Sequence, residues 1–173
     1  MKKKSQELFN IFCRYIILLI IVLISSFSKI FYELFLKLTI YPSSWLLNIF
    51  YSSSVYKSII FASSYSIELI PACIAVSAYL LLLILNLTIR MPLKKRIYSS
   101  AFSFLLLLIV NILRIFIFSL LLIKNYPYFD QLHEFFWYFL SIVIVLGIWF
   151  LTTYVFKISN IPVYSDFKSI KSK

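Results

Sequence analysis

The sequence predicts an all-α membrane protein whose transmembrane helices form one bundle. Of the 173 residues, 62% are hydrophobic and 13% are charged. Ordinary soluble domains of this length do not have that composition. The chain also has a single glycine and shows no internal repeat, low-complexity tract or linker. We therefore expect residues 1–173 to form one transmembrane domain.

Four apolar stretches approach the roughly 20 residues that a spanning helix needs. The first opens near Ile11 and continues with mixed polarity to Ile40. Glu33 and Lys37 stand four residues apart in it and could pair on one helix face, which favours one long helix over a separate short span. The other three stretches cover residues 71–89, 99–123 and 133–156. We predict four transmembrane helices, with five as the alternative.

The positions of lysine and arginine predict the orientation of these helices, because cytoplasmic segments are enriched in both. The N-terminus, residues 90–96 and the C-terminal tail are basic, whereas segments 41–70 and 124–132 hold one lysine each. Both termini and a basic loop at 90–96 are therefore expected in the cytoplasm, and segment 41–70 outside. The net charge of +11 then needs no nucleic-acid partner, because the basic residues flank membrane spans. Segment 41–70 alternates small polar with apolar residues, as an interfacial helix, a hairpin or a plain connector would.

Three chemically distinctive residues are expected near the outer surface. Cys73 begins the second span, Arg114 lies roughly 10 to 14 Å below the outer end of the third, and His133 opens the fourth. Each has a structural alternative: a thiol can be a small hydrophobe, a boundary histidine an end group, and a deep arginine a helix clamp. Their convergence on one leaflet favours a single site. Cys13 lies a membrane thickness away, which excludes a disulfide with Cys73.

These residues would suit an acyl-transfer site. Pro71 fits the first position of a helix, which would put Cys73 in the first turn, where free N–H groups and the helix dipole favour a thiolate. A cation such as Arg114 would favour the thiolate further, and His133 could act as general base and then acid. The first-turn N–H groups or Arg114 could hold the oxyanion.

Two further residues are supporting candidates. Asn111 lies three residues before Arg114 on nearly the same helix face, and it could orient the guanidinium or join two helices. Glu68 could pair with Arg114 or His133, or be a solvated boundary charge. No metal is expected, because one histidine and two thiols at opposite membrane faces make no typical ligand set, and no cofactor motif is present.

The segments PACIA around Cys73, NILRIF with Asn111 and Arg114, and LHEFF with His133 resemble the exosortase and archaeosortase family in residue type and order. The short archaeal members called pacearchaeosortases look most similar. The resemblance covers roughly residues 68–139. It differs at Ile74, where many members carry Ser or Thr directly after the cysteine.

The resemblance implies a membrane-embedded cysteine protease and transpeptidase. Such an enzyme cleaves the C-terminal sorting-signal helix from secreted proteins and transfers them to a membrane lipid or another acceptor at the cell surface. The site would face outward in a multi-pass protein of the cell membrane. The alternative is a non-enzymatic assembly subunit or a small transporter, in which Arg114 would contact a partner's acid or an anionic substrate.

Overall fold

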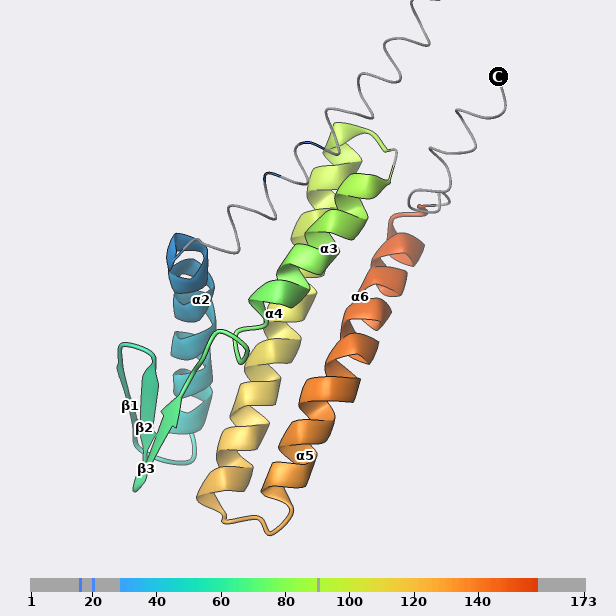
Figure 1. Ribbon diagram of the computed structural model, residues 1–173. Helices are drawn as coiled ribbons and strands as arrows, with labels where there is room; N and C mark the ends of the chain where they lie inside the picture. The colour runs from blue at the N-terminus through green and yellow to red at the C-terminus, as the bar shows by residue number, and fades with distance from the viewer. Residues whose placement is uncertain (1–15, 17–19, 21–28, 90, 159–173) are drawn as a thin grey trace, which may run out of the picture.

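The computed structural model describes residues 16, 20, 29–89 and 91–158 (Figure 1). The predicted first span falls mostly outside these residues. The helices and strands follow in the order α2 (Lys29–Asn48), β1 (Ser53–Tyr56), β2 (Ile59–Ala62), β3 (Tyr65–Glu68), α3 (Val76–Thr88), α4 (Leu93–Ile123), α5 (Phe129–Phe135), the π-helical turn η1 (Phe136–Leu140) and α6 (Ser141–Val155).

Two helices of the described part are long and apolar enough to cross a membrane. One is α4, with 31 residues, and the other is the continuous run Phe129–Val155, with 27 residues. α3 has 13 residues and spans about 20 Å, which is short of the ~30 Å hydrocarbon layer. The prediction of four transmembrane helices is therefore not supported: the expected span at 71–89 is a turn followed by this short helix.

The all-α prediction is also wrong, because part of segment 41–70 forms an antiparallel sheet in the order β1-β2-β3. Phe61 at its centre pairs with Ser54 on one side and with Ser66 on the other. Two-residue loops join the strands, and each begins with a residue at positive φ, Lys57 at 54° and Ser63 at 55°. Hairpin loops usually place glycine or asparagine at such positions, so the sequence lacked the ordinary hairpin signal.

Two predicted boundaries also shift. Segment 41–70 is not wholly a connector, because α2 continues to Asn48 before the sheet begins. The basic loop expected at 90–96 is shorter, because α4 already begins at Leu93 and includes Lys94, Lys95 and Arg96. Proline at position 92 ends the turn between α3 and α4 and directly precedes the helix, a place where its missing N–H costs little.

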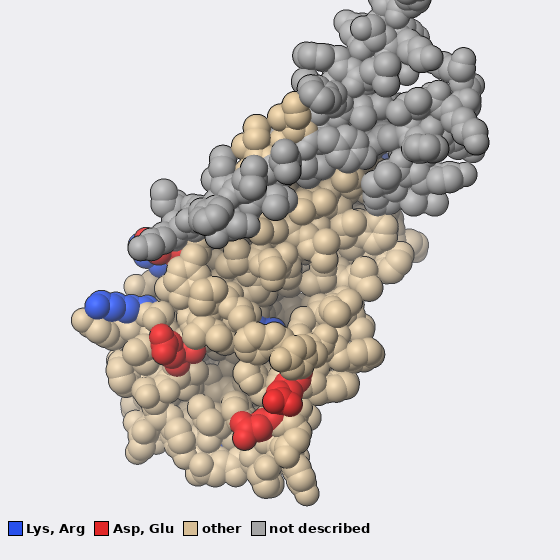
Figure 2. All heavy atoms as spheres, in the orientation of Figure 1, with Lys and Arg blue, Asp and Glu red and all other residues tan. Residues whose placement is uncertain are grey.

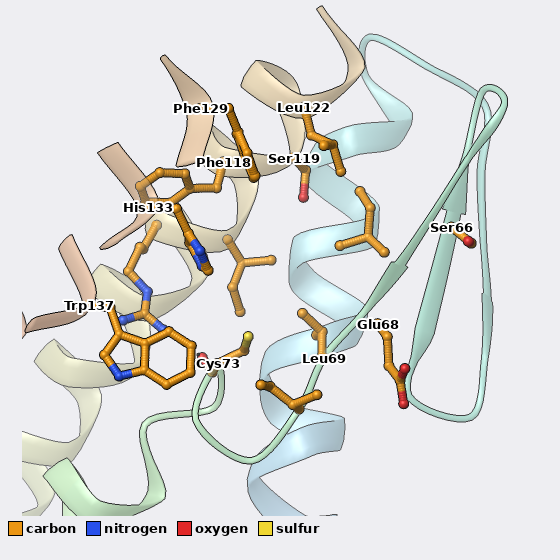
Figure 3. A pocket seen from close by; sticks show the side chains of 14 residues that line it. Ser66, Glu68, Leu69, Cys73, Phe118, Ser119, Leu122, Phe129, His133 and Trp137 are labelled. Atoms are coloured by element: carbon orange, nitrogen blue, oxygen red, sulfur yellow. Dashed lines mark hydrogen bonds between the residues drawn. The ribbon is translucent and has the colours of Figure 1, made fainter. Parts of the chain in front are cut away.

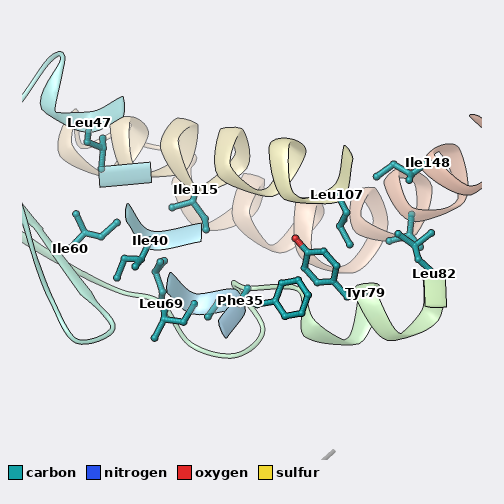
Figure 4. Packing of buried hydrophobic residues seen from close by; sticks show 13 residues of the cluster. Phe35, Ile40, Leu47, Ile60, Leu69, Tyr79, Leu82, Leu107, Ile115 and Ile148 are labelled. Atoms are coloured by element: carbon teal, nitrogen blue, oxygen red, sulfur yellow. The ribbon is translucent and has the colours of Figure 1, made fainter. Parts of the chain in front are cut away.

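The core forms where α2, α3 and α6 pack against the central helix α4 (Figure 1). Tyr79 of α3 is fully buried, and its ring lies 4.0 Å from that of Phe35 and 5.5 Å from that of Phe104, measured between centroids. Figure 4 shows this cluster continuing toward the sheet through Leu69 and Ile60. The sheet is thus anchored to the helices by buried apolar residues, which gives strand β3 a fixed position beside α4.

A belt of buried polar side chains joins α3, α4 and α6 near the α3–α4 turn. Asn86 accepts a hydrogen bond from Ser99 at 3.2 Å and donates one to Ser103 at 3.5 Å. The Ser103 and Thr152 hydroxyls share a hydrogen bond of 2.9 Å. In an apolar environment such bonds hold helices at a defined rotation and height, because an unpaired polar group there is costly.

Candidate active site

A cavity of about 290 Å³ lies between β3, the turn that follows it, and the facing parts of α4 and α5. Cys73, Arg114 and His133 all line it. These residues come from three separate segments, and Figure 3 shows the Cys73 side chain and the His133 ring extending into the same space. The sequence-predicted trio is therefore brought together. Cys73 is a free, half-buried thiol.

Cys73 does not lie in the first turn of a helix, which corrects the sequence prediction. Residues 71–75 form consecutive turns, and α3 begins only at Val76. Pro71 is therefore not the first helical residue. The N–H of Cys73 donates to the carbonyl of Ile70 at 2.9 Å, so it is not free to stabilise an oxyanion. The argument from the helix dipole does not apply to this thiol.

Two side chains of α4 hold this turn through one atom, the main-chain oxygen of Cys73. Asn111 Nδ2 donates to it at 3.0 Å and an Nη of Arg114 at 2.9 Å. In a regular helix the same oxygen would accept from the N–H four residues later, so these long-range bonds compensate for the unwound backbone. Non-helical backbone in apolar surroundings needs such partners. Arg114 thus has, in part, the structural role of a helix clamp that was its alternative interpretation from the sequence.

Arg114 also keeps donors for the cavity. A guanidinium has five N–H groups, and Arg114 makes one side-chain hydrogen bond among the described residues. Because Arg114 lines the cavity, the remaining donors provide positive charge next to Cys73. Glu68 lines the cavity as well but is exposed and forms no ion pair with Arg114 or His133 in the described part of the chain. The pairing considered for Glu68 is therefore absent there.

Removing one clamp donor should destabilise the fold measurably. We expect Asn111→Ala to lower the free energy of unfolding by about 1 kcal/mol, because the Cys73 carbonyl would keep only its hydrogen bond from Arg114. Thermal denaturation in detergent measures this change. Ser119→Ala is the control: Ser119 is also buried on α4, but its hydroxyl has no partner among the described residues. Equal melting temperatures for the two variants would contradict the clamp.

Ala75 adopts a left-handed backbone conformation, with φ 58° and ψ 36°, directly before α3. This conformation costs about 1 to 2 kcal/mol for a residue that carries a Cβ atom. We therefore expect Ala75→Gly to leave stability unchanged or raise it by up to about 1 kcal/mol, whereas Ala78→Gly inside α3 should lower it by about 0.5 to 1 kcal/mol. Melting temperatures of the two variants compare them, and equal losses would contradict the geometry.

Aromatic side chains hold the imidazole of His133. The ring of Phe129 stacks on it at 5.7 Å between centroids, with 8° between the planes. Phe118 and Trp137 contact it edge to face at 5.3 and 5.8 Å. Phe129, His133 and Trp137 are spaced four residues apart on the continuous helix Phe129–Val155, so they share one face of it. This cage restricts the ring to few orientations.

The residue directly after Cys73, Ile74, is apolar. Its side chain is fully buried in the hydrophobic core, next to the half-buried Cys73. A hydroxyl at position 74 would need a partner in that core. An apolar residue therefore fits this position.

Several cavity residues were not predicted from the sequence. Ser119 is 2% exposed, has no hydrogen-bond partner in the described part, and points into the cavity (Figure 3). Phe118, Phe129 and Trp137 are common residues in apolar helices, so only their spacing relative to Arg114 and His133 could have indicated them. The strand residues Ser66 to Glu68 were missed together with the sheet.

Three acidic residues lie at the end of the molecule that carries the cavity, together with Lys57 and Lys124. Figure 2 shows acidic side chains around a hollow at this end of the described surface. Asp130 and Glu134 flank His133 in α5, and Glu68 lies at the end of β3. At the opposite end Lys95 donates to the main-chain oxygen of Lys157 at 3.0 Å. No group of three or more His, Cys, Asp or Glu side chains that could hold a metal occurs among residues 29–89 and 91–158.

No protein-family model matches the chain, and comparisons with curated proteins and with solved structures give no significant match.

Proposed function

We propose that this protein is a membrane-embedded cysteine transpeptidase that removes a C-terminal sorting helix from secreted proteins. The observation that carries the proposal is the convergence of Cys73, Arg114 and His133 on one cavity. Arg114 follows Cys73 by 41 residues, and His133 follows Arg114 after the rest of α4 and the turn that leads into α5. A thiol, a cation and an imidazole in one partly enclosed space are the groups that acyl transfer through a thioester needs.

In the first half of the reaction the Cys73 sulfur attacks the scissile carbonyl carbon. His133 takes the thiol proton, and a tetrahedral intermediate forms. The carbon–nitrogen bond then breaks, His133 gives its proton to the leaving amine, and a thioester remains on Cys73. An amine or hydroxyl of the acceptor attacks the thioester and loses its proton to His133. The carbon–sulfur bond breaks and Cys73 is restored.

Arg114 has two roles in this scheme. One N–H fixes the Cys73 turn, and the remaining donors stabilise the oxyanion of the tetrahedral intermediate. The helix N-terminus contributes no donor from Cys73 itself, because that N–H is bonded to Ile70. The Arg114 guanidinium therefore replaces the backbone donors that the sequence suggested.

We further propose that the protein is a multi-pass protein of the cell membrane with the cavity facing outward. Only 22% of the most apolar window of α4 and 17% of that of Phe129–Val155 are buried inside the protein, which supports contact with lipid. The cluster of basic residues at the opposite end, with Lys94, Lys95 and Lys157, supports this orientation. The segment resemblance to the exosortase and archaeosortase family supports the same reaction and a lipid or other surface acceptor.

The alternative is a non-enzymatic assembly subunit or small transporter that uses Arg114. The hydrogen bond from Arg114 to the Cys73 carbonyl favours a structural role for the arginine, and this bond needs no thiol. In that case the free donors of Arg114 would bind an acidic partner or an anionic substrate. The two functions differ in their requirement for the sulfur atom of Cys73.

The experiment is coexpression with a secreted reporter that ends in an apolar helix and a basic tail, followed by intact mass measurement of the reporter. We expect loss of the helix and tail, with an added mass that identifies the acceptor. Brief alkaline hydroxylamine treatment should release reporter from a covalent adduct mapped to the peptide that contains Cys73. The proposal would be contradicted if no reporter is processed, whatever its C-terminal helix, and the peptide that contains Cys73 carries no adduct.

A further inference from the structure

Strand β3 has an unpaired edge. The sheet order β1-β2-β3 leaves β3 with one neighbour. The N–H of Leu69 donates to Ser58 across from it at 2.8 Å, in the same register that pairs Ile67 with Ile60. Antiparallel strands form these bonds at alternate residues. The main-chain groups of Ser66 and Glu68 therefore point away from β2, toward the open side.

This free edge belongs to the cavity. The residues from Ser66 to Ile70 form one of its walls, and the chain then passes directly into the turn that carries Cys73. Figure 3 shows β3 running alongside the space into which Cys73 and His133 extend. A polypeptide that continued the sheet next to β3 would therefore lie next to the thiol.

The opposite wall offers a hydrogen bond that the protein leaves unused. Ser119 of α4 is 2% exposed, lines the cavity, and its hydroxyl has no partner among the described residues. An unpaired buried hydroxyl is costly, and such groups in native proteins usually have a ligand or a water. Ile115 and Leu122 lie beside it and make the wall apolar. An extended peptide has polar groups on both edges, so β3 could pair with one edge and Ser119 with the other.

Two side-chain hydrogen bonds hold β3 at a fixed distance from the helices. Tyr65 donates to Asn125 Oδ1 in the α4–α5 turn at 2.6 Å. Tyr32 of α2 donates to the main-chain oxygen of Leu69 at 3.0 Å. The space between β3 and α4 is thus formed before a ligand binds, which reduces the entropy cost of binding.

We infer that the substrate segment next to the scissile bond binds as an extended strand along the free edge of β3, with the hydroxyl of Ser119 on its other side. The inference rests on the proposed function and assigns its substrate-binding surface. Main-chain hydrogen bonds give such strand addition its affinity, and pockets for alternate side chains give specificity. The substrate therefore has to be unwound at the cleavage site.

The test uses the full-length Cys13→Ala protein in detergent. The sequence has two cysteines, so Cys73 is the one thiol left in this variant. The probe is acetyl-tetra-alanine chloromethyl ketone, whose methylene carbon forms a bond to the Cys73 sulfur as chloride leaves. Four further probes each carry one N-methyl group. The alkylation rate of each is divided by the rate with iodoacetamide, which needs no peptide recognition.

Strand addition predicts an alternating result. N-methylation at every second position should slow alkylation by about 3- to 10-fold, because a bond to the edge of β3 is lost, and intervening positions should change less. Equal effects at all four positions would overturn the inference. A second result would also overturn it. For each reagent, the alkylation rate with Cys73 is divided by its rate with free cysteine, and this ratio would be no higher for the peptide probe than for iodoacetamide.

Three variants locate the strand. Ser66→Pro removes an N–H at the free edge and should slow the peptide probe by about 3- to 10-fold, whereas Ser66→Ala keeps that N–H and should not. Val55→Pro is the matched control, because the N–H of Val55 points outward at the β1 edge, like that of Ser53, which donates to Asn48. Iodoacetamide rates and melting temperatures report whether each variant is folded. A folded Ser66→Pro with an unchanged peptide rate would overturn the inference.

Ser119→Ala should slow alkylation by the peptide probe by about 2- to 10-fold without changing the iodoacetamide rate.

The strand inference and the proposed function fail in different ways. If all four N-methyl probes react at the same rate while reporter processing still requires Cys73, only the strand-binding inference is rejected. Processing that survives Cys73→Ala rejects the proposed function.

Discussion

Cys73→Ala is expected to abolish processing of the reporter while the protein remains folded. The thiol is the only nucleophile proposed for the reaction, and its loss leaves no group that can form the acyl intermediate. The fold should survive, because the clamp by Asn111 and Arg114 holds the main-chain oxygen of residue 73 and not its side chain. Reporter mass and melting temperature together measure the two effects.

Cys13→Ala is the control for Cys73→Ala, because it removes the other thiol of the chain. It should leave processing unchanged. If Cys73→Ala processes the reporter as well as the wild-type protein does, the nucleophile assignment is wrong. The assembly subunit or transporter, which needs no sulfur at position 73, then becomes the better explanation of the cavity.

Replacing His133 should slow processing by about 10²- to 10⁴-fold, the usual contribution of a general acid and base. We expect His133→Gln to keep the aromatic contacts in part and to lose the proton transfer. Single-turnover rates of reporter cleavage measure the chemical step. The amide of glutamine cannot accept the thiol proton, although it can still form hydrogen bonds.

Glu134→Gln is the control for His133→Gln, because Glu134 is the next residue of α5, is exposed, and does not line the cavity. It should change the cleavage rate by less than about 3-fold. Phe129→Leu should have an intermediate effect, because it removes the ring that stacks on His133. A His133→Gln protein with the wild-type rate would mean that another group, such as one on the substrate, is the base.

The clustering of Cys73, Arg114 and His133 was easier to predict than the fold. Cys73, Arg114 and His133 are polar residues in apolar surroundings, so composition alone made them conspicuous. Their convergence was expected from four spans, and the structure brings them together although α3 is too short to be one of these spans. Ser119 escaped detection because a single serine in an apolar helix usually bonds to its own backbone. Its importance depends on the cavity, which only the tertiary structure reveals.

The unwound turn and the sheet depended on contacts that the local sequence does not contain. Pro71 is a good first residue for a helix, but α3 begins at Val76, because the Cys73 carbonyl accepts from residues 38 and 41 positions away. Segment 41–70 alternates small polar with apolar residues, and period two is the signal of a strand. Loops that start with Lys57 and Ser63 gave no glycine to mark the turns.

For the membrane insertion proposed above, the polar belt between α3 and α4 sets the order in which polar groups pair during synthesis. A 13-residue helix that contains Asn86 is a poor candidate for insertion alone. Its partners Ser99 and Ser103 follow closely in the sequence, just after the α3–α4 turn. The two helices can therefore insert as one hairpin with the asparagine already paired, and α6 adds only the bond from Thr152 afterwards. The order of synthesis then matches the order in which the polar groups find their partners.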